Sequence, residues 1–220
     1  SFSFTPALTD EGRRNRAITV VIRSRDDASS AARTAALTAG RTKAPIAVAT
    51  KGIMPRKLGG HDDPHAWQSV ANVKIYVANI RDGLIAAAPD KAAVFKANAD
   101  AYLARLEALD REVHEAVAKI PEVRRKVIST HDAFGYFADA YGITFFSPLS
   151  VSTDSEPSAR DIAAIVAQIK LAKIPAVFLE NISDPRLIQR IAAETGARVG
   201  GTLYSDSLTG EKGQAPTYID

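Results

Sequence analysis

The sequence contains no cysteine, and this absence excludes disulfide bonds, thiolate metal sites and cysteine nucleophiles together. Any metal ion must therefore be bound by carboxylates and by the four histidines. No apolar run is long enough to cross a bilayer, and no basic-then-apolar leader stands at Ser1. We therefore expect no membrane span and no visible signal peptide, although a processed secreted protein has the same appearance.

Acidic residues are scarce at the amino end. Residues 1–58 hold 11 of the 28 Lys and Arg but only 4 of the 25 Asp and Glu. The arginines of this segment come without interleaved aromatic residues or a known binding motif, which argues against a nucleic-acid partner. The 220 residues are 46% hydrophobic and 24% charged, a composition that predicts one large or two small globular domains.

The first half of the chain predicts a parallel unit followed by two long helices. β-Branched residues favour strands over 18–22 and 45–50, and an Ala-rich helix is expected over 29–39 between them. Helices are then expected over 66–88 and 90–120, the second long enough to serve as a strut between two lobes. The buried stripes predicted for these two helices are Val70, Val73, Val77, Ile80 and Leu84, and Val94, Tyr102, Leu106, Leu109, Val113, Val117 and Ile120.

The second half alternates strands and helices, which predicts another parallel lobe. Ser158 is the expected cap of one helix, and Gly142 and Gly196 are expected to end two others. Strands are predicted over 126–130, 143–147, 176–180 and 198–203, and helices up to residue 141, over 159–172 and over 185–195. The fold class is therefore α/β, with an amino-terminal lobe over 1–89, a linking helix over 90–120 and a carboxy-terminal lobe over 121–220.

Three side chains share a placement that suits a ligand site. His131 follows a predicted strand, and Asp206 follows another, so both fall at the carboxyl edge of the sheet, where ligands of open α/β folds gather. Asp63 and Pro64 resemble a cap and a first helical position, which puts His65 in the first turn of a helix, where the helix dipole favours neutral imidazole. Two imidazoles and a carboxylate suit Zn²⁺, Mn²⁺ or Fe²⁺.

Two other polar residues near these motifs have two interpretations each. His61 is either a metal-collecting ligand or a solvated loop residue, and Glu180 is either a partner that orients an imidazole or a loop contact. Thr130 or Asp132 is expected to cap the helix that follows. The remaining expectations are that Phe134, Phe137 and Tyr141 share a helix face, that Trp67 and Phe134 pack beside the site, that His114 is a surface residue, and that Glu156 precedes a cap.

Five segments resemble the metal-binding solute receptors of ABC importers, the TroA-like or ZnuA-like family, and the resemblance runs from about residue 44 to 220. These segments are HDDPHAW, THDAFGYFADAYGI, STDSEPSARDI, AVFLENISDPRLIQRIAAETG and LYSDSL. The resemblance implies two α/β lobes joined by one long helix, with a divalent ion between the lobes. It implies His65, His131 and Asp206 as metal ligands, and a monomeric receptor that delivers its ion to a membrane permease.

The same resemblance implies a periplasmic or membrane-attached extracellular location. Family members with glutamate in place of His131 tend towards manganese, so histidine here favours zinc, with manganese or iron as the alternative. The chain departs from the family because no histidine precedes His61 and residues 1–40 do not match. We therefore expect an incomplete or atypical amino-terminal lobe. Because the family continues beyond Asp220, the resemblance implies either a fragment or a variant of the family.

Two other functions compete with the receptor. A metal-dependent hydrolase needs an open coordination position and a general base, but the sequence contains no H-E-x-x-H motif and no order of residues that indicates a triad. We therefore predict that the chain is not an enzyme. An adhesin-like or degenerate member of the family, with weak or no metal binding, remains the alternative because the fourth ligand is missing.

Overall fold

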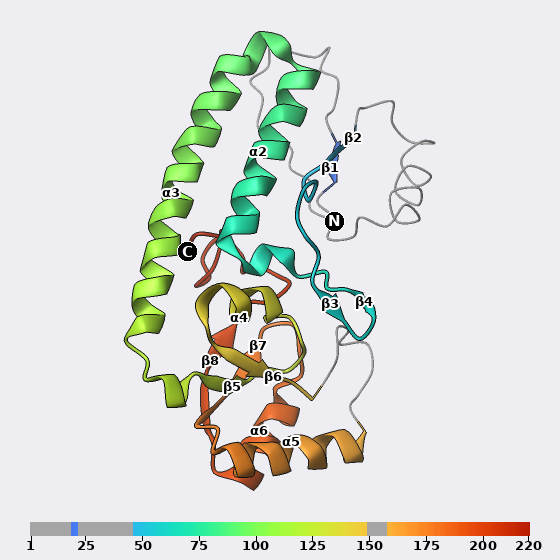
Figure 1. Cartoon of the computed structure of the whole chain (residues 1–220), viewed down its shortest axis with the longest axis vertical. Helices are drawn as coiled ribbons and strands as arrows, with labels where there is room; N and C mark the ends of the chain where they lie inside the picture. Colours follow the sequence, from blue (N-terminus) through green and yellow to red (C-terminus); the bar gives the residue numbers. More distant parts are fainter. Residues whose placement is uncertain (1–18, 22–45, 149–157) are drawn as a thin grey trace. The chain divides into compact units, whose positions relative to one another are not determined.

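The computed structural model describes residues 19–21, 46–148 and 158–220 (Figure 1). The chain divides into two compact units, Ser1–Pro55 with Val70–Ala108, and Arg56–Ser69 with Leu109–Asp220. The predicted domain boundaries stay a prediction. The structure adds that His65 belongs to the same compact unit as His131 and Asp206. Within the described residues, no helix combines the length and the apolar character that a bilayer crossing requires.

In the first unit, β1 (Thr19–Val21) and β2 (Ile46–Val48) pair in parallel, as the predicted order of elements requires. The helix expected over 29–39 lies outside the described residues. Helix α2 (Val70–Ala87) packs against β2 so closely that a Cβ atom at Gly83 would lie 2.6 Å from the Cβ atom of Ala47. A larger residue at position 83 would therefore push α2 away from the strand.

Helix α2 buries two of the residues that its pattern predicts, Val70 and Val73, and also Tyr76, which the pattern does not indicate. The predicted helix start at residue 66 is wrong in detail, because a separate 3₁₀ turn, η1 (Ala66–Gln68), precedes α2. The chain then turns through a second 3₁₀ element, η2 (Pro89–Lys91).

Helix α3 (Ala92–Ala118) confirms the long helix, and its 27 residues extend about 40 Å. Leu106 and Val117 are buried as predicted, but Val94 is 57% exposed, so its place in the buried stripe is wrong. Val94 is eight residues before Tyr102 and so points about 80° away from it, whereas Phe95, seven residues before, shares its face. The stripe accordingly continues through Ala99, which is buried.

The second unit is built on a four-stranded sheet in which every neighbouring pair is parallel, in the order β6-β5-β7-β8. The predicted strands and helices of this region are confirmed, with shifts of one to several residues at some ends. Its strands are β5 (Lys126–Ile128), β6 (Thr144–Phe146), β7 (Ala176–Glu180) and β8 (Arg198–Leu203), and its helices are α4 (Gly135–Tyr141), α5 (Ala159–Ala172) and α6 (Pro185–Thr195). A 3₁₀ turn, η3 (Glu122–Arg124), leads into β5, and a small antiparallel pair, β3 (Lys57–Leu58) with β4 (His61–Asp62), precedes η1.

The order of the strands decides where the helices lie. The chain leaves β5 for β6 on one side and then returns to β7 on the other, so right-handed crossovers place α4 on one face and α5 with α6 on the opposite face, as Figure 1 shows. The core of this unit lies between the sheet and the helices α5 and α6. It contains Ile128, Ile165, Ile169, Ile174, Val177, Ile188, Ile191 and Ala192.

The helix ends of this unit follow their sequence signals, with one exception. Ser158 and Asp161 form a complete capping box at α5, and Gly142 and Gly196 end their helices with φ of 75° and 74°. The exception is α4, which begins after Phe134 without a side-chain cap, so the predicted capping by Thr130 or Asp132 is wrong. The chain first makes a turn in which the amide of Ala133 donates to the carbonyl of His131. The helix therefore begins too far along the chain for Thr130 or Asp132 to be its cap.

Candidate metal centre

The carboxyl edge of this sheet brings the three predicted ligands together. His131 follows β5, Asp206 follows β8, and His65 immediately precedes η1. One ligand atom of each residue lies within 4.8 Å of the other two. The Nε2 atom of His65 is 3.6 Å from Oδ1 of Asp206, and Nε2 of His131 is 3.3 Å from Oδ2 of the same carboxylate.

This place in the sheet has a topological reason. The chain reverses direction across the sheet between β5 and β7, and such a switch point opens a crevice outside the carboxyl ends of the strands. His131 stands beyond the end of β5, and Glu180 is the last residue of β7. Because β7 lies between β5 and β8, Glu180 stands between the segments that carry His131 and Asp206.

His65 is oriented by a carboxylate two residues before it. Oδ1 of Asp63 accepts the backbone N–H of His65 at 3.0 Å and lies 2.8 Å from its Nδ1 atom. A proton on Nδ1 is thereby directed at the carboxylate, which leaves the lone pair on Nε2, the atom that faces Asp206. His65 thus precedes the first helical turn instead of lying in it, and the contact that orients its ring is with Asp63.

His131 is supported by a carboxylate from another strand. Oε1 of Glu180 accepts the backbone N–H groups of Thr130 and His131 at 2.7 and 3.0 Å, and Oε2 lies 2.6 Å from Nδ1 of His131. The contact between Glu180 and His131 confirms the reading of Glu180 as the partner of an imidazole. His131 is fully buried, and among the described residues its Nε2 atom has no aligned hydrogen-bond partner. A buried ring of this kind suits a ligand that approaches Nε2.

The charges of the site are strongly coupled. Burial alone lowers the pKa of His131, but the carboxylates of Asp206 and Glu180 outweigh it and raise this pKa to about 9. Burial raises the pKa of Glu180, but contacts with His131 and Ser205 hold it below its ordinary value. The pKa of Asp63 is also lowered, because hydrogen bonds from His65 and Arg56 outweigh its burial. Both supporting carboxylates are therefore ionised at neutral pH.

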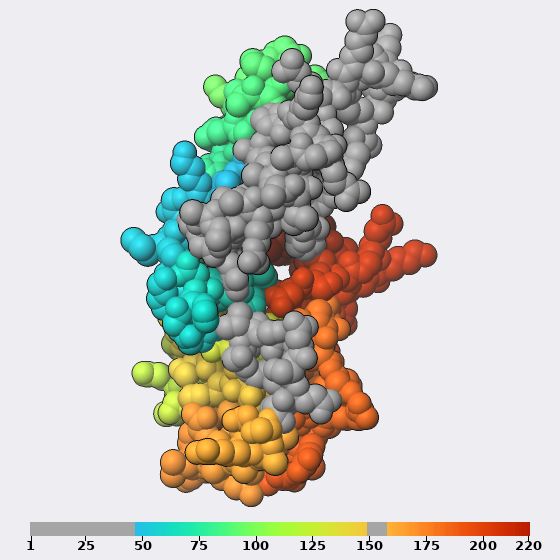
Figure 2. Space-filling model, turned by 90° about the vertical axis from the view of Figure 1, so that its right-hand side faces the viewer, coloured from blue at the N-terminus to red at the C-terminus, as the bar shows by residue number. Residues whose placement is uncertain are grey.

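Asp206 is the exposed member of the group. Its side chain is 33% exposed, whereas the side chains of His65 and His131 are 2% and 0% exposed. Figure 2 shows the segment that follows β8, in red, at the surface. The turn before Asp206 is nevertheless fixed, because the carbonyl of Ser205 accepts Nε1–H of Trp67 at 2.9 Å and Nε2–H of Gln68 at 3.0 Å. The solvent-facing ligand is thus carried by a well-held backbone.

Trp67 packs beside the site, as predicted, whereas the aromatic partner of Phe134 is Phe145, and its place beside the site stays a prediction. The indole of Trp67 meets the ring of His65 edge to face, with centroids 5.6 Å apart, and Tyr218 donates its hydroxyl to the Trp67 carbonyl. Phe134 is buried and stacks on Phe145 with centroids 4.7 Å apart. Trp67 therefore packs against His65 and also donates a hydrogen bond to the carbonyl of Ser205, which no sequence pattern indicates.

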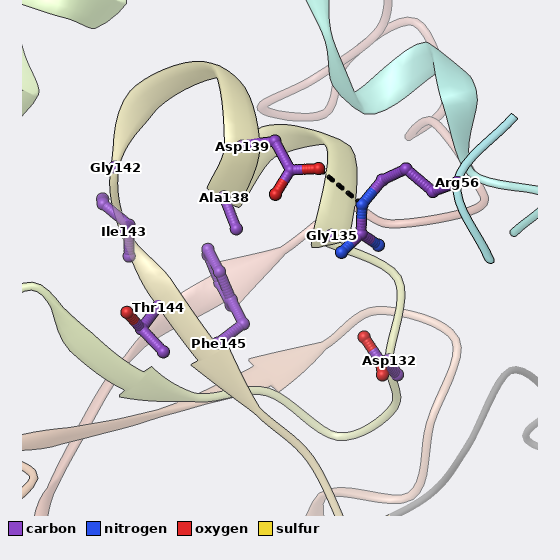
Figure 3. A pocket seen from close by; sticks show the side chains of 9 residues that line it. All are labelled: Arg56, Asp132, Gly135, Ala138, Asp139, Gly142, Ile143, Thr144 and Phe145. Atoms are coloured by element: carbon purple, nitrogen blue, oxygen red, sulfur yellow. Dashed lines mark hydrogen bonds and ion pairs between the residues drawn. The ribbon is translucent and has the colours of Figure 1, made fainter. Parts of the chain in front are cut away.

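Arg56 connects Asp63, the support of His65, to α4, and no sequence pattern indicates this contact. Nη1 of Arg56 donates to Oδ2 of Asp63 at 2.9 Å, and Nε donates to Oδ2 of Asp139 at 2.6 Å (Figure 3). A Cβ atom at Gly135 would lie 1.7 Å from Nη1, so glycine at the start of α4 gives the guanidinium its space. Figure 3 shows Arg56, Asp139 and Gly135 at a pocket, which Asp132 also lines. The volume of this pocket is about 410 Å³.

The other polar candidates stand apart from the group. His61 is exposed in the β3–β4 pair, and His114 is an exposed residue of α3 whose ring packs against Tyr141. Glu156 lies outside the described residues. In the described ranges, His65, His131 and Asp206 form the one group of three or more such side chains with a metal-ligand arrangement. A fourth ligand is therefore not supplied by the described part of the chain.

The distances suit a small divalent ion. Two ligand atoms at 2.0–2.1 Å from a tetrahedral zinc ion stand about 3.4 Å apart. The two distances from imidazole Nε2 atoms to the Asp206 carboxylate, 3.6 and 3.3 Å, are close to this value. Each imidazole also has the carboxylate partner on Nδ1 that accompanies most metal-bound histidines.

Comparison with known proteins agrees with this arrangement. The chain is 36% identical over 180 residues to the iron-binding protein YfeA of Yersinia pestis, which covers 80% of this chain and 58% of that protein. It is 35% identical over 158 residues to the manganese-binding lipoprotein MntA of Halalkalibacterium halodurans, covering 72% and 53%. The chain thus spans about half the length of these curated relatives.

Solved structures show the same fold. The periplasmic zinc binding protein TroA of Treponema pallidum matches with a TM-score of 0.82 and 25% identity, covering 93% of this chain and 76% of that one. A Mn-bound periplasmic metal binding protein of Candidatus Liberibacter asiaticus matches with a TM-score of 0.80 and 26% identity, covering 93% and 77%. The predicted TroA-like α/β fold is therefore confirmed.

Fold and relatives together define a class of metal-binding substrate-binding proteins of transporters, which are receptors and not enzymes. The family model described as zinc-uptake complex component A, periplasmic, matches residues 15–220, and the chain belongs to this family.

Proposed function

We propose that this chain captures a divalent metal ion as the receptor of a metal ABC importer and delivers it to a membrane permease. Nε2 of His65, Nε2 of His131 and the carboxylate of Asp206 bind the ion. One observation carries the proposal: each imidazole has a carboxylate at Nδ1 and turns its Nε2 atom towards the same Asp206 carboxylate. This arrangement supports metal binding.

Zinc is the favoured cargo. Two imidazoles with one carboxylate suit zinc, although manganese and iron accept the same donors. The names of the relatives include iron for YfeA, manganese for MntA and zinc for TroA, so the family accommodates all three. The histidine at position 131 supports zinc for this chain.

Location and partner follow from the same relatives. TroA is described as a periplasmic zinc binding protein and MntA as a manganese-binding lipoprotein. A further relative, SsaB of Streptococcus sanguinis, is described as a metal ABC transporter substrate-binding lipoprotein. We therefore place this receptor outside the cytoplasm, in a periplasm or attached to an outer face of the membrane, as a monomer whose partner is the permease. The three proposed ligands all belong to one compact unit, Arg56–Ser69 with Leu109–Asp220.

A thermal melt of metal-stripped protein tests the proposal. A ligand that binds only the native state must stabilise it, so stoichiometric Zn²⁺ should raise the melting temperature, and more than Mn²⁺ or Fe²⁺ does. Native mass spectrometry should count one ion per chain. No shift with any of the three ions would overturn the receptor, and a larger shift with Mn²⁺ or Fe²⁺ would overturn zinc as the cargo.

The second candidate is an adhesin-like or degenerate member of the family with weak or no metal binding. It is favoured by the three-ligand group, because an open coordination position leaves the ion partly held by solvent. Binding that appears only at millimolar Zn²⁺, with an intact cooperative melt, would support this candidate over the receptor.

A further inference from the structure

Ser205 contacts Glu180, the support of His131, and two residues that follow His65, and it precedes the third proposed ligand. Its hydroxyl donates to Oε2 of Glu180 at 2.6 Å, and Glu180 supports His131. Its carbonyl accepts from Trp67 and Gln68, which follow His65 along the chain. Ser205 is 3% exposed, so these contacts are made away from solvent.

We propose that Ser205 is a positioning residue that holds the three ligand-bearing segments at the spacing a metal ion requires. The inference rests on the proposed function and adds a residue that does not itself touch the ion. The hydroxyl fixes the His131 side, the carbonyl fixes the His65 side, and the peptide bond to Asp206 transmits both restraints to the carboxylate.

The hydroxyl contact is the stronger restraint. It is a charge-assisted bond to a buried carboxylate, and bonds of this kind are shorter and stronger than neutral ones. Without the hydroxyl, Oε2 of Glu180 keeps only its contact with His131 and can move towards that ring. The relative positions of Asp206 and His131 then depend on fewer contacts.

A second contact of the same turn separates positioning from general support. Nδ2 of Asn181 donates to the carbonyl of Ser207 at 3.1 Å on the other side of Asp206. Asn181 follows Glu180 in the chain, but this bond involves neither the carboxylate of Glu180 nor the side chains of Trp67 and Gln68. Asn181→Ala is therefore a matched control that loosens the turn and leaves the connection between the ligand segments in place.

The experiment compares Ser205→Ala, Ser205→Thr and Asn181→Ala in the metal-stripped full chain, with Zn²⁺ titrations and the visible absorption spectrum of bound Co²⁺. Ser205→Ala should weaken Zn²⁺ binding about 10-fold and alter the Co²⁺ spectrum, since partners of metal ligands contribute 10–100-fold to affinity. Ser205→Thr keeps the hydroxyl and should restore the affinity to within about 3-fold, and Asn181→Ala should stay within the same range.

Ser158→Ala controls for lost stability, because it removes a serine hydroxyl from the capping box of α5. It should lower the melting temperature without changing the Co²⁺ spectrum. Wild-type affinity and an unchanged spectrum for Ser205→Ala would overturn the positioning role while leaving the receptor intact. Absence of Zn²⁺ binding in the wild-type chain would instead overturn the proposed function.

Discussion

The two histidines of the site reach similar surroundings by different routes. Asp63, the partner of His65, is two residues away in the sequence and shares its charge with Arg56. Glu180, the partner of His131, is 49 residues away and is held by two backbone N–H groups and the Ser205 hydroxyl. One support is thus local and neutralised by a cation. The other depends on the assembled sheet and forms no ion pair with an arginine of the described ranges.

This difference indicates how such a site is made. The local support forms wherever the Asp63-Pro64-His65 turn forms, but the distant support requires β5 and β7 to be in register. We therefore expect metal binding by His131 to respond more strongly than metal binding by His65 to changes in the sheet and in charge.

The largest effect should come from removing the proposed ligands. His131→Ala and His65→Ala should each weaken Zn²⁺ binding about 100-fold or more, because each removes one of only three ligands, and this corresponds to about 3 kcal/mol. Isothermal titration calorimetry measures the change. His61→Ala is the control and should bind as the wild type does; an equal loss for it would make the exposed histidine a ligand.

The next comparison replaces each supporting carboxylate by its amide. Glu180→Gln should weaken Zn²⁺ binding about 10–100-fold, since it removes the full charge beside His131. Asp63→Asn should cost less than about 10-fold, because Arg56 already balances that charge. Competition with a zinc indicator dye measures both, and losses of equal size would show that the two routes are energetically equivalent.

The stability of the metal-free chain should depend on pH through the charge of His131. The pKa of His131 is raised to about 9, so its protonated form stabilises the fold fully below pH about 6.5, and this contribution disappears as the pH rises through 9. The loss amounts to at most about 3 kcal/mol. Urea unfolding between pH 6 and 9.5 measures it, and His131→Gln should show a flatter profile.

Zn²⁺ binding should change with pH in the opposite sense. The ion must displace the proton from His131, so affinity should fall as the medium is acidified. Affinity that is equal at pH 7.5 and pH 5 would contradict ligation by histidine.

The smallest effect belongs to Arg56, which acts on His65 through Asp63. Arg56→Met should weaken Zn²⁺ binding only a few-fold, because Asp63 keeps both of its contacts with His65. Gly135→Ala should have a similar effect by displacing the guanidinium. Arg186→Met breaks an exposed ion pair with Asp184 at α6 and is the matched control. A loss as large as that of His65→Ala would mean that Arg56 determines the position of the whole segment.

Much of the second unit could be predicted from the sequence, because its strands and helices alternate with clear punctuation. The limits of β7, α6 and β8 match the predicted ranges, and Ser158, Gly142 and Gly196 act as local signals. Local rules failed where a distant contact decided the conformation. The turn that presents His131 is held by Glu180, so α4 begins later than a capping rule indicates.

The same distinction applies to the site. The pattern of strands predicts that His131 and Asp206 follow strand ends. It also predicts Glu180 at the end of β7. The sequence does not indicate the polar contacts of Arg56, Ser205 and Trp67, because the partners of these residues lie up to 138 residues away in the chain. Asp63 was interpreted only as a cap, since a carboxylate before a helix has the same local appearance in either role.

The unequal exposure of the three proposed ligands has a consequence for exchange kinetics. Solvent reaches the group at Asp206, while both imidazoles are enclosed. An arriving ion therefore meets the carboxylate before it sheds its last water molecules to the imidazoles, and a departing ion breaks with Asp206 last. The lifetime of the bound state would then be set by how often the two enclosed imidazoles release the ion, and a chelator in solution would take the ion from Asp206 only after that release.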